Sequence, residues 1–122
     1  HMKIEMTNPR QCGCGRYGCL EAYASATAVV KRAQEIVATK VKGPSILRDA
    51  LQGSTEELPA RAVFEAAEKG DEYAKEVIDR TAFYLAVGTT NVMHTINPDM
   101  IVFGGGMTAA GSGFLQQIRN YV

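Results

Sequence analysis

The sequence predicts a mostly helical α/β domain with one or two short strands. Two long segments, 20–40 and 72–95, repeat apolar residues at the three- and four-residue spacing of a helix. A short apolar run at 100–103 is followed by three glycines, as is typical of a buried strand that ends in a turn. The chain has 122 residues, of which 46% are hydrophobic and 21% charged, and this suits one globular domain.

The N-terminal part is predicted to contain a short strand and a long helix. Residues 2–6 alternate apolar and polar side chains, which favours a strand. The helical spacing then covers 20–40, and the Gly43-Pro44 pair ends the helix. We expect its polar face to carry Lys31, Arg32, Gln34 and Glu35.

Three shorter helices are also predicted. Residues 45–51 form a helical turn, and 60–69 form a helix that Gly70 closes. Residues 113–122 begin another helix after the glycine-rich turn.

The longest predicted helix spans 72–95, with Asp71 as its N-cap. Its second half is small and apolar on all sides, so we expect that half to be buried. Gly88 costs about 1 kcal/mol relative to alanine inside a helix, which indicates a close approach to another backbone or to a ligand. The Asn97-Pro98 pair ends the helix, because proline disfavours helical geometry at the preceding residue.

All the cysteines of the chain, Cys12, Cys14 and Cys19, lie in one glycine-rich loop. Such spacing can wrap a loop around a zinc ion, which takes four thiolate or imidazole ligands in a tetrahedron. A redox loop, or a disulfide with one free thiol, is the alternative. The fourth ligand would be His1 or His94, of which His94 is more typical of a helix end.

The three glycines after the 100–103 segment form a second candidate site. Backbone N–H groups in a glycine-rich turn between a strand and a helix can cradle a phosphate group. A strand-to-helix turn that binds nothing explains the same residues equally well.

Two segments resemble one known family. The pattern Cys-x-Cys-Gly-x-x-Gly-Cys-x-Glu at 12–21 resembles the signature of the ROK family (repressor, open reading frame, kinase). This family contains bacterial glucokinases, other hexose and N-acetylhexosamine kinases, and sugar-responsive repressors. Residues 97–106 resemble the Asn-Pro-x-x-Ile-Val-x-Gly-Gly-Gly segment of the same kinases, and Gly88 to Asn91 resemble the stretch before it. The resemblance covers nearly the whole chain.

The resemblance implies three sets of site residues. The ligands of a structural Zn²⁺ would be Cys12, Cys14, Cys19 and His1. His1 lies eleven positions before Cys12, about one residue more than in the family. The hexose would contact Glu21 and His1, although a carboxylate at 21 is also favoured by the helix dipole alone. The adenine and ribose of ATP would lie beside Gly104, Gly105 and Gly106.

The function implied by the resemblance is transfer of phosphate from ATP-Mg²⁺ to the 6-hydroxyl of glucose or a related hexose. The whole protein would have two actin-like lobes of the ribonuclease H type. This chain would be part of the C-terminal lobe, with a zinc and sugar loop (1–21), a helical region (20–97), and a strand, nucleotide turn and helix start (98–122). The catalytic aspartate motif and the Asp-x-Gly-x-Thr phosphate loop of the family do not occur here, so we expect the isolated chain to be inactive.

Two other functions remain open at this point. The chain could be the sugar-sensing domain of a ROK-family repressor, which keeps the cysteine motif but carries a DNA-binding domain upstream. It could also be a zinc-stabilised helical module for protein contacts.

The charge of the chain excludes a basic nucleic-acid-binding surface. Thirteen basic and thirteen acidic residues give a net charge of zero. No apolar run reaches the roughly 18 residues that span a bilayer. Clustered thiols without an export signal suit the cytoplasm.

The two ends of the sequence suggest a piece of a longer protein. His1-Met2 matches the remnant of an expression tag as well as a native ligand, and a helix is still under way at 122. We expect a fragment with exposed apolar surface, which favours homo-oligomers.

Overall fold

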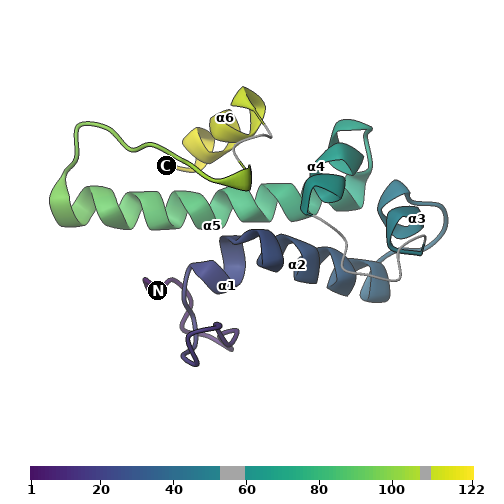
Figure 1. The fold of residues 1–122 in the computed structure, drawn as a ribbon, viewed down its shortest axis with the longest axis horizontal. Coiled ribbons are helices and arrows are strands. Elements are labelled where there is room, and N and C mark those ends of the chain that lie inside the picture. Colours follow the sequence, from purple (N-terminus) through teal and green to yellow (C-terminus); the bar gives the residue numbers. More distant parts are fainter. Residues whose placement is uncertain (53–59, 108–110) are drawn as a thin grey trace.

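The computed structural model describes residues 1–52, 60–107 and 111–122, and most of these residues are helical (Figure 1). The mostly helical fold class predicted from the sequence is therefore confirmed. In order, the helices are α1 (Glu21–Ala24), α2 (Ala26–Thr39), α3 (Ile46–Gln52), α4 (Ala60–Glu68), α5 (Glu72–Ile96) and α6 (Ser112–Tyr121). In the described part of the chain, no helix combines the length and the apolar character needed to cross a membrane.

Helix α5 is the central element, and the other helices pack along it. Figure 1 shows α1 and α2 on one side of α5, and α4 and α6 on the other. The core fills the space between them, and the residues that contribute are mainly Val29, Ala33, Val63, Val77, Ala82, Phe114 and Ile118. The apolar stripe of α5 is buried from Ala74 to Gly88. The prediction that the whole second half of this helix is buried is wrong, because residues 89–92 are half-buried and residues 93–96 are exposed.

Both ends of α5 are fixed by the residues that predicted them. The Asp71 carboxylate accepts a hydrogen bond from the Ala74 N–H at 2.8 Å. Asn97 takes left-handed backbone angles (φ 45°), and its N–H donates to the Met93 carbonyl at 2.9 Å. The predicted bounds of this helix are confirmed to within one residue.

The helix predicted over 20–40 is broken at Ser25. The Ser25 backbone is extended, with ψ 165°, and its Oγ accepts a hydrogen bond from the Ala28 N–H at 3.1 Å. Serine prefers N-cap positions because its hydroxyl replaces a missing helical partner. A short α1 therefore precedes α2, and the two helices run in different directions (Figure 1).

The prediction that Arg32 lies on a polar face is wrong. Its side chain is buried, where it donates to Thr81 Oγ1 at 3.0 Å and to the Tyr23 carbonyl at 2.6 Å. The guanidinium also lies over the Tyr84 ring, 5.3 Å from its centroid. Arg32 therefore links α1, α2 and α5 through polar contacts inside the core.

The predicted strand at 100–103 does not form. Met100 and Val102 are 78% and 80% exposed, and the segment runs along α5 without regular pairing. A strand requires a partner, and none of the described segments pairs with this one. The predicted strand at 2–6 is reduced to a single antiparallel bridge, between Lys3 and Cys19. The three shorter helices are confirmed as α3, α4 and α6.

Candidate functional site

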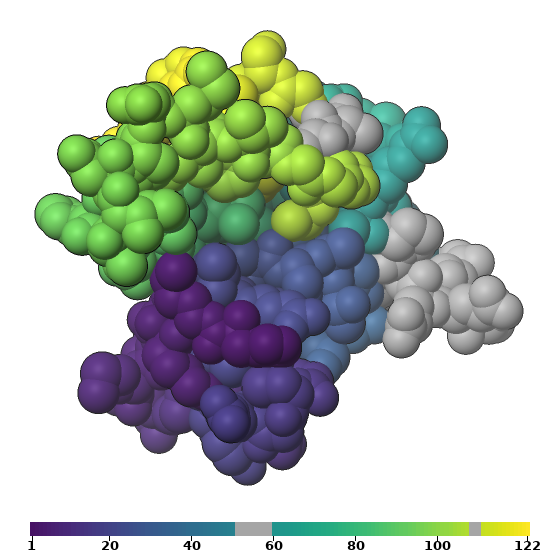
Figure 2. Space-filling model, turned by 60° about the vertical axis from the view of Figure 1, so that its left-hand side comes forward, coloured from purple at the N-terminus to yellow at the C-terminus, as the bar shows by residue number. Residues whose placement is uncertain are grey.

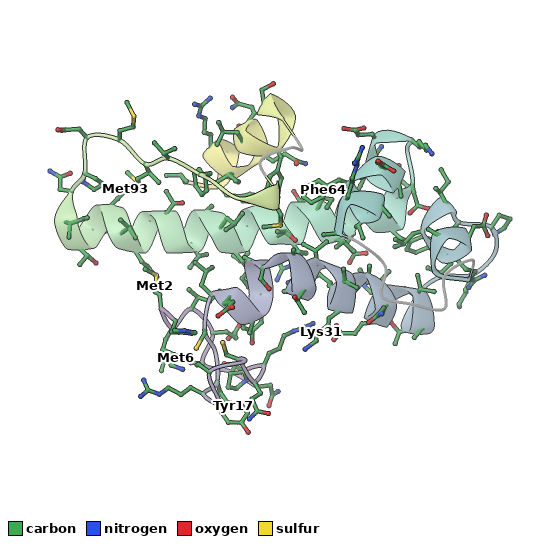
Figure 3. The ribbon with its side chains drawn as sticks, viewed as in Figure 1. Met2, Met6, Tyr17, Lys31, Phe64 and Met93 are labelled. Atoms are coloured by element: carbon green, nitrogen blue, oxygen red, sulfur yellow. The ribbon has the colours of Figure 1, made fainter. Side chains whose placement is uncertain are left out.

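The cysteine loop (residues 1–20) is held together mainly by backbone hydrogen bonds. It projects below α1 in Figure 1, and Figure 3 shows Tyr17 at its lower end and Met6 between Met2 and Tyr17. The bonds that join its segments are Ile4 N–H to the Gly18 carbonyl (2.8 Å), Leu20 N–H to Met2 (2.8 Å), Gly18 N–H to Arg10 (2.9 Å) and Cys12 N–H to Arg16 (2.7 Å). The buried side chains of the loop are those of Cys12 and Cys19, whereas Met6 is 91% exposed.

Gly18 lies at the centre of this network, and only glycine fits there. Its φ is +77°, and a Cβ atom would lie 2.2 Å from the backbone oxygen of Glu5. Gly13 has no atom within 4 Å of the position of a Cβ.

We therefore expect Gly18→Ala to disrupt the loop and Gly13→Ala to be tolerated. The first change combines a strained backbone with a clash against another backbone, which together cost roughly 2–4 kcal/mol. Amide hydrogen exchange at 1–20 measures the effect. Equal exchange in the two variants would contradict this account of Gly18.

Four potential metal ligands converge inside the loop. The ligand atoms of His1, Cys12, Cys14 and Cys19 all lie within 4.8 Å of one another. The Sγ atoms of Cys14 and Cys19 are 3.7 Å apart, and Cys12 Sγ is 3.7 Å from His1 Nδ1. A tetrahedral ion with Zn–S bonds of about 2.3 Å separates two sulfurs by about 3.8 Å. Disulfide sulfurs lie at about 2.05 Å, so the spacing fits zinc better than a cross-link.

The thiols of this cluster influence one another. For Cys14, the hydrogen bond from the Arg16 N–H is the main cause of a lowered pKa, and the neighbouring thiols and Lys3 act in the same direction. For Cys12, the Cys14 N–H lowers the pKa, but burial and the adjacent thiols together outweigh it and raise the pKa. A bound divalent cation would hold all of these groups as thiolates.

Glu21 lies at the edge of the thiol cluster. Its Oε2 is 3.5 Å from His1 Nδ1 and 3.6 Å from Cys12 Sγ, and its side chain is 59% exposed. As the first residue of α1 it sits where the helix dipole favours a negative charge. The carboxylate is held near the cluster while remaining open to solvent.

A groove of about 460 Å³ begins beside Glu21 and continues along α2. Polar side chains line much of it, among them Arg10, Ser25, Lys31 and Glu35. Arg10 was not predicted as part of the site, and no local pattern in the sequence indicates it. Its N–H donates to the Tyr23 hydroxyl at 2.7 Å, and its guanidinium pairs with Glu35 at 2.5 Å.

Helix α5 supports the site through Gly88. A Cβ atom at this position would lie 2.6 Å from Leu20 Cδ2, so the glycine makes room for the residue between Cys19 and Glu21. A close approach at Gly88 is present, but the predicted neighbour, a backbone or a ligand, is wrong, because the neighbour is the Leu20 side chain. Met2 of the loop also contacts α5, where Asn91 Nδ2 is 3.6 Å from its Sδ (Figure 3).

The predicted nucleotide turn is on the other side of α5. Gly104, Gly105 and Gly106 follow the extended segment 98–103, opposite the cysteine loop (Figure 1). Figure 2 shows the same separation, with the N-terminal residues in purple below and the 98–107 region in green above. Gly104 borders an apolar groove of about 990 Å³ between α5 and α6. His94 is exposed in the last turn of α5, as expected of a helix-end histidine.

Comparison with known proteins places these features in one family. The family model of the ROK family matches residues 1–122. The chain belongs to the ROK family. The sequence-based identification of this family is confirmed.

The ROK relatives include both kinases and repressors. The chain is 36% identical to a glucokinase of Halalkalibacterium halodurans over 99% of this chain and 36% of the relative. It is 37% identical to a glucokinase of Thermotoga maritima, over 100% of this chain and 37% of the relative. It is also 32% identical to a putative xylose repressor of Caldicellulosiruptor sp., over 100% of this chain and 29% of the relative. The chain therefore spans little more than a third of the length of these glucokinases.

Solved ROK structures share the fold of this chain. A ROK family glucokinase from Streptomyces griseus, in complex with glucose and AMPPNP, aligns with a TM-score of 0.82 and 30% identity, over 99% of this chain and 38% of that one. A ROK family transcriptional regulator, a homologue of the E. coli MLC protein, aligns with a TM-score of 0.76 and 30% identity. The alignment covers 99% of this chain and 30% of the regulator. The fold is that of part of an actin-like ROK sugar kinase.

Proposed function

We propose that this chain is the zinc-braced, sugar-binding part of an ATP-dependent hexokinase of the glucokinase type. The observation that supports this most directly is the convergence of four metal ligands beside the exposed Glu21 carboxylate. The whole protein would transfer phosphate from ATP-Mg²⁺ to the 6-hydroxyl of glucose or a related hexose. Within it, the chain would form part of the C-terminal lobe.

The metal in this proposal is a structural Zn²⁺ bound by Cys12, Cys14, Cys19 and His1. Bound zinc would fix the fold of the loop, with every coordination position taken by protein. Glu21 would accept hydrogen bonds from sugar hydroxyls, and His1 would contact the sugar through the ring edge that faces away from the metal.

The nucleotide would bind at the glycine turn. Gly104, Gly105 and Gly106 carry no side chains that would block adenine or ribose, and the similar S. griseus glucokinase holds AMPPNP and glucose together. The isolated chain carries neither a catalytic aspartate motif nor an Asp-x-Gly-x-Thr loop. We propose that it does not phosphorylate sugar by itself, and glucose-dependent ADP formation by this chain alone would contradict that.

The test of the sugar contact is Glu21→Gln in the whole protein. A hydrogen bond to a charged group contributes about 1.5–3 kcal/mol, so we expect kcat/KM for glucose to fall about 10- to 150-fold. Glu68→Gln, at an exposed position at the end of α4, is the matched control and should leave kcat/KM unchanged. Equal kinetics for the two variants would overturn the role of Glu21.

The second candidate is the sugar-sensing domain of a ROK repressor, which the similarity to the putative xylose repressor supports. In that case the whole protein would bind sugar and DNA without consuming ATP. Sugar binding with no ADP formation by the whole protein would favour the repressor. Zinc binding with no sugar binding at all would favour a helical module for protein contacts.

We also propose that the chain self-associates in the cytoplasm. Met100, Val102 and Ile96 expose 78%, 80% and 69% of their surface. Such a patch favours association, and a cluster of reduced thiols is stable in a reducing compartment. Light scattering should show dimers or larger assemblies, and Val102→Lys should reduce them.

A further inference from the structure

Lys3 contacts the candidate metal cluster at Cys19, whereas Glu21 contacts it at His1 and Cys12. Its Nζ donates a hydrogen bond to Cys19 Sγ at 3.3 Å and another to the Tyr17 carbonyl. Lys3 and Cys19 also face each other in an antiparallel bridge, so the ammonium group is positioned by the backbone as well. Cys19 is fully buried, whereas Lys3 is exposed at the rim of the loop.

Zinc binding changes the charge beside this ammonium group. When Zn²⁺ binds three cysteines and one neutral histidine, three S–H bonds are replaced by three Zn–S bonds and three protons leave. The cluster then carries a formal charge of −1, whereas the metal-free cluster with protonated thiols is neutral. Glu21 adds a further negative charge at the edge formed by Cys12 and His1. A cation next to a ligand sulfur therefore stabilises the loaded state more than the empty one.

We propose that Lys3 is a positioning residue of the metal centre, whose ammonium group offsets the charge of the loaded cluster and slows the loss of Zn²⁺. This inference rests on the proposed zinc site. It gives Lys3 a role beyond bridging two loop segments.

A purely structural role predicts a different pattern. If Lys3 acted only by bonding to the Tyr17 carbonyl, its loss would loosen the loop independently of salt. A charge effect at an exposed position is screened by salt, because the Debye length falls from about 10 Å at 0.1 M to about 3 Å at 1 M.

The experiment measures zinc release from the loaded chain to an excess of a chromogenic chelator. Partners outside the ligand set commonly change metal affinity by 10- to 100-fold. We expect Lys3→Met to release zinc about tenfold faster than the native chain at low salt, with the difference shrinking at 1 M salt. Lys3→Arg keeps the charge and should restore most of the native rate.

Lys69→Met is the matched control, because it removes the same charge from an exposed position beyond the end of α4. It should release zinc at the native rate. Native release from Lys3→Met, or a difference that does not depend on salt, would overturn the role of Lys3. A native chain that binds no zinc would instead overturn the proposed metal site, so the two failures are distinguishable.

Discussion

Replacing Cys12 with serine is expected to weaken zinc binding by about 100- to 1,000-fold and to unfold residues 1–20, while the helices remain. Structural zinc in small peptides binds with about 10–16 kcal/mol, and one of four ligands accounts for roughly a quarter of this. A loss of about 2.5–4 kcal/mol corresponds to that change in affinity. Competition with a chelator of known affinity measures it.

The loop should unfold because it has little else to stabilise it. Its backbone bonds join short segments, and large apolar side chains such as Met6 and Tyr17 are 91% and 55% exposed. The helices begin only at Glu21, and the core formed by α2, α4, α5 and α6 includes no residue of the loop. Far-UV circular dichroism should therefore change little, while amide exchange rises sharply in 1–20.

The two histidines offer a matched pair of controls. His1→Ala should weaken zinc binding to a similar extent, because His1 Nδ1 lies 3.7 Å from Cys12 Sγ within the cluster. His94→Ala should leave zinc binding unchanged, because His94 lies in the last turn of α5, outside the cluster. A metal-free chain with an ordered loop, or sulfurs found cross-linked, would contradict the proposed site.

The sequence predicted best those features that depend on neighbouring residues. The ends of α5 follow from Asp71 and Asn97, whose side-chain and backbone preferences act within one turn. The grouping of Cys12, Cys14 and Cys19 is likewise local, because the three thiols lie within eight residues of a glycine-rich segment. Gly88 indicated a close approach, but only the packing of the chain identified Leu20 as the neighbour.

Features that depend on distant partners were missed. Arginine is usually a surface residue. The Arg32 side chain is nevertheless buried, because Thr81, 49 positions further along the chain, accepts its hydrogen bond in the core. The 100–103 segment has strand-forming residues, but strand formation also requires a neighbour, which no described segment supplies. Lys3 was not predicted as part of the site because its link to Cys19 spans 16 residues of folded loop.

Replacing Asp71 with alanine is expected to give the largest loss of stability outside the metal site. One carboxylate oxygen caps α5 through the Ala74 N–H, and the other accepts the Ser45 hydroxyl at 2.7 Å and the Leu47 N–H at 3.3 Å. Loss of an N-cap costs about 0.5–2 kcal/mol, and buried groups left without partners cost about 1–3 kcal/mol. We expect a total of roughly 2–4 kcal/mol from urea unfolding of the zinc-loaded chain.

Two further variants distinguish the loss of the helix cap in Asp71→Ala from the loss of one negative charge. Asparagine is as good an N-cap as aspartate, so Asp71→Asn should retain the bond to Ala74 and lose about half as much stability. Asp99→Ala removes the same charge from an exposed position beyond α5 and should have little effect. Equal losses in Asp71→Ala and Asp99→Ala would contradict this role of Asp71.

The same carboxylate predicts the response to acid. Burial alone raises the pKa of Asp71, but the hydrogen bonds from Ser45, Ala74, Leu47 and Tyr73 outweigh burial and lower the pKa below its ordinary value. The folded state therefore binds this proton more weakly than the unfolded chain does. The stabilisation is fully present above the ordinary carboxyl pKa of about 3.9 and is lost as the pH falls through the lower pKa of the folded state. Between neutral pH and strong acid, the native chain should lose more stability than Asp71→Asn, which has no carboxyl group to protonate there.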